Sequence, residues 1–298
     1  MQTGQVAIEA NALPAARAIK RTPWREGWKK LRKQKAAMIG GGFIIVFVLV
    51  GILAPYLAPY DPIAQNLSNT LKPPSAEHWL GTDDSGRDIL SRILYGARVS
   101  LTIGFFSVIG SLIVGALLGL LAGFFGNRID TIISRLFDIM LAFPGVLLAI
   151  AIVAILGPGL FNALLAIAIV NIPMYGRLIR AKVLSVKQEE YIMAARAQGM
   201  STWRILFRHV LPNSWTPLIV QGTLGIASAI LEAAALGFLG LGAQPPEAEW
   251  GKMLADSRDY ITNAPWVVMT PGLAIMLSVI GFNLFGDGLR DALDPKMK

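Results

Sequence analysis

The sequence is dominated by runs of apolar residues long enough to cross a lipid bilayer. They occupy residues 36–57, 101–125, 136–156, 160–175, 218–241 and 266–285. An α-helix of about 20 residues spans the ~30 Å hydrocarbon core of a bilayer. Only a helix or a closed barrel satisfies its backbone hydrogen bonds in lipid. The chain is therefore predicted to be an all-α, polytopic membrane protein with six transmembrane helices.

The composition excludes several other classes of protein. Hydrophobic residues make up 54% of the chain and charged residues 15%, against about 25% charged in a typical soluble domain. With no cysteine and two histidines, the chain lacks the ligands of a disulfide scaffold or a structural zinc site. It also contains no P-loop pattern. We therefore predict no catalytic residue, no metal site and no cofactor bound by this chain.

The distribution of Lys and Arg predicts the topology. Segments 1–35, 126–135, 176–214 and 286–298 contain 9, 2, 7 and 3 basic residues, whereas segments 58–100 and 242–265 contain 4 and 2. Basic residues accumulate in cytoplasmic connections. Both termini are therefore predicted to be cytoplasmic. The net charge of +8 reflects this asymmetry, and nucleic acid is not an expected partner.

Four parts of the chain follow from this topology. Residues 1–35 form a basic cytoplasmic segment, 36–57 the first transmembrane helix, 58–100 an extracytoplasmic segment, and 101–298 a core of five helices. Within the extracytoplasmic segment, the sequence of residues 81–88 predicts a tight turn. The spacing of Ile89, Leu90, Ile93 and Leu94 then predicts a short amphipathic helix at the outer interface. The acidic residues of this turn lack the spacing of a calcium loop, so a capped turn is expected.

The cytoplasmic loop 176–214 has the clearest local pattern. Helix-forming residues run up to Gly199, which is suited to a left-handed C-terminal cap. Ser201 is expected to begin a second helix, and Pro212 to end it. The small side chains of Ala194 and Ala195 would give the first helix a flat surface for another protein. Two short helices joined by a glycine elbow are predicted.

The second of these helices has an expected apolar face. Trp203, Leu206, Phe207 and Val210 follow the i, i+3, i+4, i+7 spacing of one helix face. Asn213 and Ser214 are expected to cap the fifth transmembrane helix. An alternative interpretation is that 176–214 is an amphipathic loop on the membrane surface.

The loop resembles the coupling ("EAA") loop of membrane subunits of ATP-binding-cassette importers. Ala194, Ala195, Gly199, Leu211 and Pro212 match that motif, whereas Met193 and His209 depart from it, with acids at Glu189 and Glu190 instead. Segments 81–101, 238–251 and 286–295 are similar to the second permease subunit of dipeptide, oligopeptide, glutathione and nickel transporters, as is the opening Arg21-Thr22-Pro23-Trp24.

The resemblance implies a type I importer fold in the bacterial inner membrane. Its implied partners are a homologous permease subunit, two ATPase subunits that use ATP and Mg, and an extracytoplasmic peptide-binding protein. The residues implied in ATPase coupling are Glu190, Ala194, Ala195, Gly199 and Pro212. The implied substrate is a dipeptide, a short peptide or glutathione. Nickel is the alternative substrate, and a stand-alone secondary transporter is the alternative class.

Polar residues inside the predicted membrane segments suggest a pathway. Gln221, Gly225, Ser228 and Glu232 form one stripe of the fifth span, and Asn171 lies in the fourth. A buried acid in a membrane helix is costly and is by default functional or paired. We therefore treat Asn171, Gln221, Ser228 and Glu232 as candidate pathway residues. A hydrogen-bonded contact between helices is the alternative.

Overall fold

The computed structural model describes residues 30–293, so most of the basic segment 1–35, Arg21–Trp24 included, lies outside the described residues. The long helices are α2 (Lys35–Leu57), α3 (Ile89–Phe125), α6 (Leu160–Val186), α9 (Leu211–Phe238) and α11 (Pro265–Leu293). The shorter elements are α4 (Asn127–Leu141), α5 (Gly145–Leu156), α7 (Glu190–Ala197), α8 (Thr202–Ile205), α10 (Trp250–Ser257), the π-helical turn η2 (Leu206–Val210) and the 3-10 turns η1 (Leu67–Asn69) and η3 (Arg258–Tyr260).

The described residues agree with the predicted number of spans. Five helices are long and apolar enough to cross a membrane: α2, α3, α6, the continuous helix Thr202–Phe238, and α11. The pair α4 and α5 is bent by 92° and provides a sixth crossing if it is one broken span. The prediction of an all-helical, six-span membrane protein is confirmed by the length and composition of these helices.

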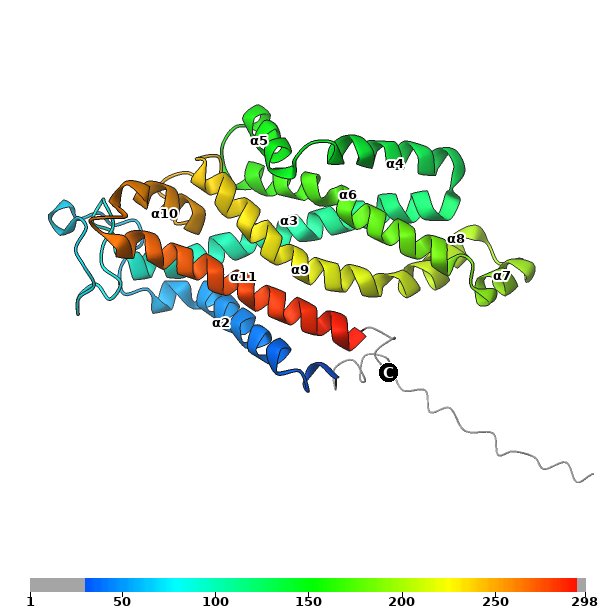
Figure 1. Cartoon of the computed structure of the whole chain (residues 1–298), viewed down its shortest axis with the longest axis horizontal. Helices are drawn as coiled ribbons and strands as arrows, with labels where there is room; N and C mark the ends of the chain where they lie inside the picture. Colours follow the sequence, from blue (N-terminus) through cyan, green and yellow to red (C-terminus); the bar gives the residue numbers. More distant parts are fainter. Residues whose placement is uncertain (1–29, 294–298) are drawn as a thin grey trace, which may run out of the picture.

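Figure 1 shows which segments share an end of the bundle. Helices α7 and α8 lie toward the same end as the start of α2 and the end of α11, whereas α10 and the 58–88 segment lie at the opposite end. This arrangement is the one that the basic-residue asymmetry requires. Which end faces the cytoplasm stays a prediction.

The core of the bundle is built on the contact between α3 and α6, the most extensive in the molecule. Gly115, Gly119 and Gly123 of α3 follow each other at intervals of one turn and face α6. An added Cβ at Gly119 would collide with the backbone oxygen of Gly176. Small residues allow helix backbones to approach closely in membranes, where the hydrophobic effect does not drive helix association.

Two predicted helix boundaries are wrong. The expected interfacial helix after residue 88 is the first part of α3, which runs without a break from Ile89 to Phe125. The fourth span does not end near Pro173 but continues to Val186, with Pro173 inside the helix. At about 1.5 Å per residue, both helices exceed the ~30 Å hydrocarbon thickness. Hydropathy alone therefore marks only the most apolar part of each helix.

The predicted third span, 136–156, is not one straight helix. Helix α4 ends at Leu141, and α5 begins at Gly145 after an extended Pro144. A proline disfavours helical geometry in the residue before it, which explains a break at this point. Of the α4 side chains only that of Phe137 is fully buried, so most of this helix is uncovered within the chain.

Candidate functional site

The loop between α6 and α9 contains the predicted glycine elbow. Gly199 has a φ of +76°, the left-handed region that favours glycine. Its N–H donates to the carbonyl of Arg196 at 2.9 Å, and the N–H of Met200 donates to that of Ala195 at 3.1 Å. These two bonds form a Schellman motif. The elbow therefore ends α7 and sets the direction in which α8 starts.

The second helix of the loop does not end at Pro212, which corrects our prediction. Helices α8 and α9 are joined by η2, so one helical rod runs from Thr202 to Phe238. Pro212 lies in the first turn of α9. A proline ring clashes with the carbonyl of the preceding turn in a regular helix, and the wider π-helical turn relieves this clash.

Polar side chains donate hydrogen bonds to the backbone carbonyls near this proline. The amide of Asn213 donates to the carbonyl of His209 at 2.6 Å, and the hydroxyl of Ser214 donates to that of Val210 at 2.8 Å. These two residues do not cap the start of a new helix, so that prediction from the sequence is wrong. Ser201 occupies the N-cap position of α8 without a side-chain hydrogen bond.

The predicted apolar face of this segment is divided in two. Leu206 and Val210 are buried, together with Ile205. Trp203 and Phe207 are 57% and 52% exposed, and their rings stack with centroids 5.9 Å apart. The helical spacing was correct, but the π-helical turn changes the angular relation of residues on either side of it. An exposed aromatic pair results.

Helix α7 presents a mixed face to the outside. Ala195 is buried together with Ile192, while Ala194 is exposed beside Glu190 and Met193. The two alanines therefore do not share one flat surface, in contrast to the prediction. The available face carries one carboxylate, one thioether and a small side chain, which permits close approach by another protein.

In the bundle, the structure pairs two of the candidate pathway residues. The amide of Asn171 on α6 donates to the Glu232 carboxylate on α9 at 2.8 Å, and also to the carbonyl of Ile167 at 3.0 Å. Ser228 is exposed one turn before Glu232. Gln221 lies eleven residues away along α9, which is about 16 Å in an α-helix, and its amide faces the sulfur of Met174 at 3.9 Å.

Gly225, the remaining member of the predicted stripe, is a packing position. The Tyr175 hydroxyl of α6 occupies the place where a Cβ at Gly225 would lie. Tyr175 itself is 1% exposed. The stripe therefore combines a helix contact at Gly225 with polar groups on either side of it. The pairing across helices was not predictable from spacing within one helix.

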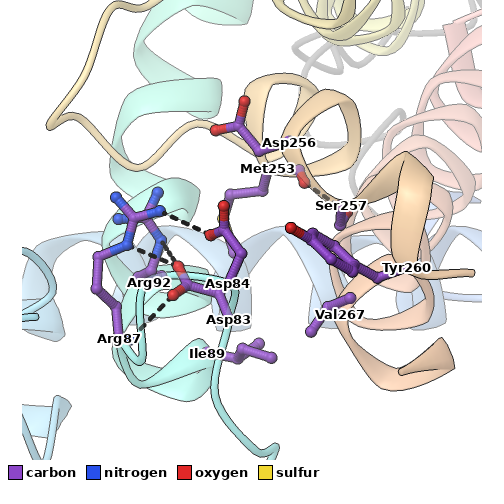
Figure 2. Close-up of a pocket in the computed structure, with 10 residues that line it drawn as sticks. All are labelled: Asp83, Asp84, Arg87, Ile89, Arg92, Met253, Asp256, Ser257, Tyr260 and Val267. Carbon is purple, nitrogen blue, oxygen red and sulfur yellow. Dashed lines mark hydrogen bonds and ion pairs between the residues drawn. The ribbon is translucent and has the colours of Figure 1, made fainter. Parts of the chain in front are cut away.

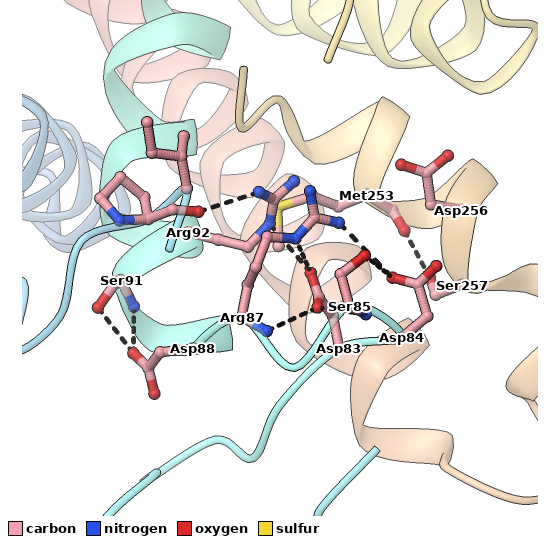
Figure 3. Close-up of polar contacts among 12 residues, drawn as sticks. Asp83, Asp84, Ser85, Arg87, Asp88, Ser91, Arg92, Met253, Asp256 and Ser257 are labelled. Carbon is pink, nitrogen blue, oxygen red and sulfur yellow. Dashed lines mark hydrogen bonds and ion pairs between the residues drawn. The ribbon is translucent and has the colours of Figure 1, made fainter. Parts of the chain in front are cut away.

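The motif 81–88 folds into an ion-paired turn at the end of the bundle opposite α7 and α8. The Asp83 carboxylate accepts a hydrogen bond from Nε of Arg87 at 2.7 Å and lies 3.4 Å from Nε of Arg92. Figure 3 shows both arginines directed at this carboxylate. Arg92 also donates to the carbonyl of Pro62 at 3.1 Å. Asp88 caps α3 by accepting from the backbone N–H of Ser91 at 2.8 Å. The prediction of a capped turn is confirmed.

This turn packs against the segment that follows span five. Figure 2 shows Asp83 and Asp84 on one side of a small hollow, with Met253, Asp256 and Tyr260 on the other. Within residues 30–293, no group of three His, Cys, Asp or Glu side chains is arranged to hold a metal ion. The ion pairs of the turn join residues 83–92 to each other, and the hollow lies between this turn and the segment formed by α10 and η3.

Glu249 is a buried acid whose role the sequence analysis missed. It is 1% exposed and caps α10 by accepting from the backbone N–H groups of Gly251 and Lys252, each at 2.8 Å. Burial raises the pKa of the Glu249 carboxyl above its ordinary value, and these two hydrogen bonds oppose that effect. An acid directly before a short helix was the available signal.

Two ion pairs connect α4 to α6, and these were also missed. Arg180 donates to Asp130 from Nε at 2.5 Å and from Nη2 at 2.7 Å, and Arg177 donates to Asp138 at 2.6 Å. Asp130 and Asp138 lie eight residues apart on one helix and the two arginines three apart on another, and no local sequence pattern indicates which acid pairs with which base. The pairs hold the otherwise uncovered α4 against α6.

Comparison with known families accounts for most of the chain. Residues 115–298 match the family described as binding-protein-dependent transport system inner membrane component. Residues 22–74 match the N-terminal TM domain of oligopeptide transport permease C. The first match contains the loop between α6 and α9 and the Asn171–Glu232 pair, and the second contains the first apolar run.

Similar proteins include three bacterial permeases. The chain is 64% identical to the dipeptide transport system permease protein DppC of Alkalihalophilus pseudofirmus, covering 93% of this chain and 91% of that protein. It is 56% identical to the di/tripeptide permease DppC of Pseudomonas aeruginosa (93% of each chain). It is 50% identical to the glutathione permease GsiD of Pectobacterium atrosepticum (93% of each chain).

Among solved structures, the fold resembles a chain of the MetNI methionine ABC transporter in an inward-facing conformation. The TM-score is 0.57 at 19% identity, with 69% of this chain and 98% of that chain covered. At this identity the likeness concerns the fold alone.

Proposed function

Because this chain belongs to the family of binding-protein-dependent transport system inner membrane components, we propose that it is the permease subunit through which an importer moves dipeptides and other short peptides. The observation that carries this proposal is the 64% identity to a dipeptide permease over nearly the full length of both chains. As a family member, the chain is a multi-pass inner-membrane transport component of an ABC importer and is not itself an enzyme.

Short peptides are favoured over the other substrates that the sequence left open. Relatives described as dipeptide, di/tripeptide and glutathione permeases are 50–64% identical to this chain. Glutathione is itself a short peptide, so these descriptions share one chemical class with free carboxylates and an ammonium group. The nickel alternative gains no support from these relatives. Family membership also disfavours a secondary transporter acting alone.

The proposed partners follow from the surfaces at the two ends of the bundle. We propose that the exposed face of α7, with Glu190, Met193 and Ala194, inserts into one of two ATPase subunits that use ATP and Mg. The Gly199 elbow joins that helix to the rod that carries Glu232. Closure of the ATPases at one end would then tilt the rod, which is a two-state change of the kind that ABC importers require.

At the outer end, the ion-paired turn is suited to receive the substrate-binding protein. Asp83 holds two arginines, so the turn is fixed before a partner arrives. Pre-ordered surfaces bind with a smaller entropic cost. A homologous permease subunit completes the pathway in this proposal, since the face of α6 and α9 that carries exposed Ser228 and three partly buried polar residues is not fully covered in the single chain. Asn171, Gln221, Ser228 and Glu232 are the proposed pathway residues on that face.

Reconstitution tests the proposal directly. The chain, its neighbouring-gene permease, both ATPases and the binding protein would be assembled in proteoliposomes, and uptake of a radiolabelled dipeptide, glutathione and Ni²⁺ measured with and without ATP. ATP-dependent dipeptide uptake that needs the binding protein is expected. Ni²⁺ uptake without peptide uptake would contradict the substrate. Uptake by this chain without the ATPases would contradict the class.

A further inference from the structure

At the inner end of the bundle, two cations converge on one aromatic ring. Nζ of Lys187, which follows α6, and the guanidinium carbon of Arg196 on α7 each lie 5.9 Å from the centroid of the Phe124 ring. The two charges are therefore at most twice that distance apart. Nζ of Lys187 also donates to the carbonyl of Phe124 at 2.7 Å. The ends of α3, α6 and α7 are brought together at this point.

The charge of this pair is not balanced by a neighbouring acid. Within residues 30–293, no carboxylate lies within 4 Å of Lys187 or Arg196. Asp130, on the adjacent α4, is held by Arg180 through two hydrogen bonds. Two like charges at this separation repel each other. An anion placed between them would remove that repulsion and gain from both.

The two cations line a hollow that has room for such an anion. Its volume is about 430 Å³, and its other walls include Phe125, Met200 and Thr202. Its lining thus combines cationic groups and a hydroxyl with apolar surface. A phosphate ester attached to an apolar body matches both kinds of wall, because the phosphate accepts from the cations.

Beside the hollow lies the exposed aromatic pair described above. Trp203 packs its edge against Phe125, with ring centroids 5.7 Å apart, and stacks on Phe207. Tryptophan side chains that remain exposed at the end of a membrane bundle are typical of the headgroup region of a bilayer. Basic residues at that depth attract anionic lipids of the cytoplasmic leaflet.

We propose that Lys187 and Arg196 bind the phosphate of one anionic phospholipid, whose glycerol and upper acyl chain rest on Phe125, Trp203 and Phe207. The site joins the last turn of α3 to the start and the end of the coupling helix. A bound lipid would therefore hold α7 in a fixed position relative to the bundle. Phosphatidylcholine, whose headgroup has no net charge, would bind more weakly.

The test measures lipid retention by the assembled complex. The complex with its partner subunits would be purified in detergent, delipidated and titrated with palmitoyl-oleoyl phosphatidylglycerol, and bound lipid counted by native mass spectrometry. The test variant is Lys187→Gln with Arg196→Gln. The matched control is Arg204→Gln with Arg208→Gln, which removes two exposed charges of the next helix that lie outside the hollow.

One retained phosphatidylglycerol per copy of this chain is expected. The test variant should bind it about 30-fold more weakly, because each of two cations near an anionic lipid contributes about a fivefold factor. The control should stay within about twofold of the wild type, on the basis that exposed charges away from a site contribute little. Phosphatidylcholine should be retained more weakly than phosphatidylglycerol.

Three results would overturn the proposal. Equal retention by the test variant and the wild type would show that these cations do not bind lipid. Displacement of the lipid by inorganic phosphate at equal concentration would identify a site for free phosphate. Loss of the ATPase subunits from the test variant, with phosphatidylglycerol still retained, would identify the two cations as a contact with a protein carboxylate.

Discussion

The side-chain amide of Asn171 donates a 2.8 Å hydrogen bond to the carboxylate of Glu232, and this contact joins α6 to α9 inside the bundle. The partner of this acid is a neutral amide. Within residues 30–293, no Lys, Arg or His side chain lies within 4 Å of Glu232. On the proposed pathway, the carboxylate would therefore be available to a substrate cation when the face opens to water.

Replacing Glu232 by Gln tests that availability. The amide keeps the shape of the side chain and an acceptor for Asn171, so the complex should assemble. Uptake of a free-amino dipeptide should fall about tenfold or more, because a hydrogen bond to a charged group contributes about 1.5–3 kcal/mol. Uptake of the N-acetylated peptide should change little. The measurement is proteoliposome uptake of matched peptides, normalised to assembled complex.

Glu232→Leu provides the contrast for this experiment. If the residue serves only the helix contact, Leu should reduce the amount of assembled complex, while Gln leaves uptake of both peptides unchanged. Equal slowing of the free and the acetylated peptide would also count against charge guidance.

Gly199→Val should separate ATP hydrolysis from transport. The left-handed conformation at φ +76° costs a β-branched residue about 1–2 kcal/mol or more, although no neighbour lies within 4 Å of an added Cβ. The strain would unwind the elbow and misdirect α8. Peptide transported per ATP hydrolysed should fall severalfold, with insertion into the membrane unchanged. Gly199→Asn is the matched control, because asparagine tolerates this conformation; if both variants transport normally, the elbow is not required for coupling.

Gly225→Ala should destabilise the bundle through Tyr175. The new methyl group would occupy the position of the Tyr175 hydroxyl, and overpacking of this kind costs about 1–3 kcal/mol. The apparent Tm of the purified complex should drop by a few degrees. Tyr175→Phe in the same chain removes the colliding oxygen and should recover most of the loss. Failure of that second change to recover stability would mean that the collision is not the cause.

Cysteine labelling would establish the orientation, since the chain has no cysteine of its own. Ser75 and Glu247 are exposed at one end and Ser201 at the other. With the predicted cytoplasmic termini, Ser75→Cys and Glu247→Cys should react with a membrane-impermeant maleimide in intact cells. Ser201→Cys should react only after the cells are opened. Labelling of Ser201→Cys from outside would reverse the topology and remove the ATPase contact.

The fold was largely predictable because hydropathy and charge act on whole segments. Apolar length placed the spans, and the capped turn at 81–88 and the Gly199 elbow were identified from local rules that depend on a few neighbouring residues. The ends of α3 and α6 were misplaced because a helix can continue into water, where tertiary contacts and not hydropathy decide its length. The bend before Gly145 lies within a continuous apolar run that hydropathy does not divide.

The site was less predictable because it depends on pairs that are distant in sequence. Glu232 and Asn171 were each identified as polar residues in apolar segments, but 61 residues separate them, and only packing of α6 on α9 brings them together. Pro212 was misread because a proline normally ends a helix. The π-helical turn that accommodates it also turned Trp203 and Phe207 outward, away from Leu206.

The unbroken helix from Thr202 to Phe238 has a mechanical consequence. Its 37 residues correspond to about 55 Å at 1.5 Å per residue, so in the proposed coupling it would act as a lever that is joined to α7 at its Thr202 end. Tilting it by about 5° around its inner end would displace its outer end by about 5 Å, on the same helix dimensions. The amplitude of opening at the outer face would then depend on the stiffness of the wide turn at Leu206–Val210. A more flexible turn would bend and reduce the tilt of α9, whereas a stiffer turn would transmit the tilt to its outer end.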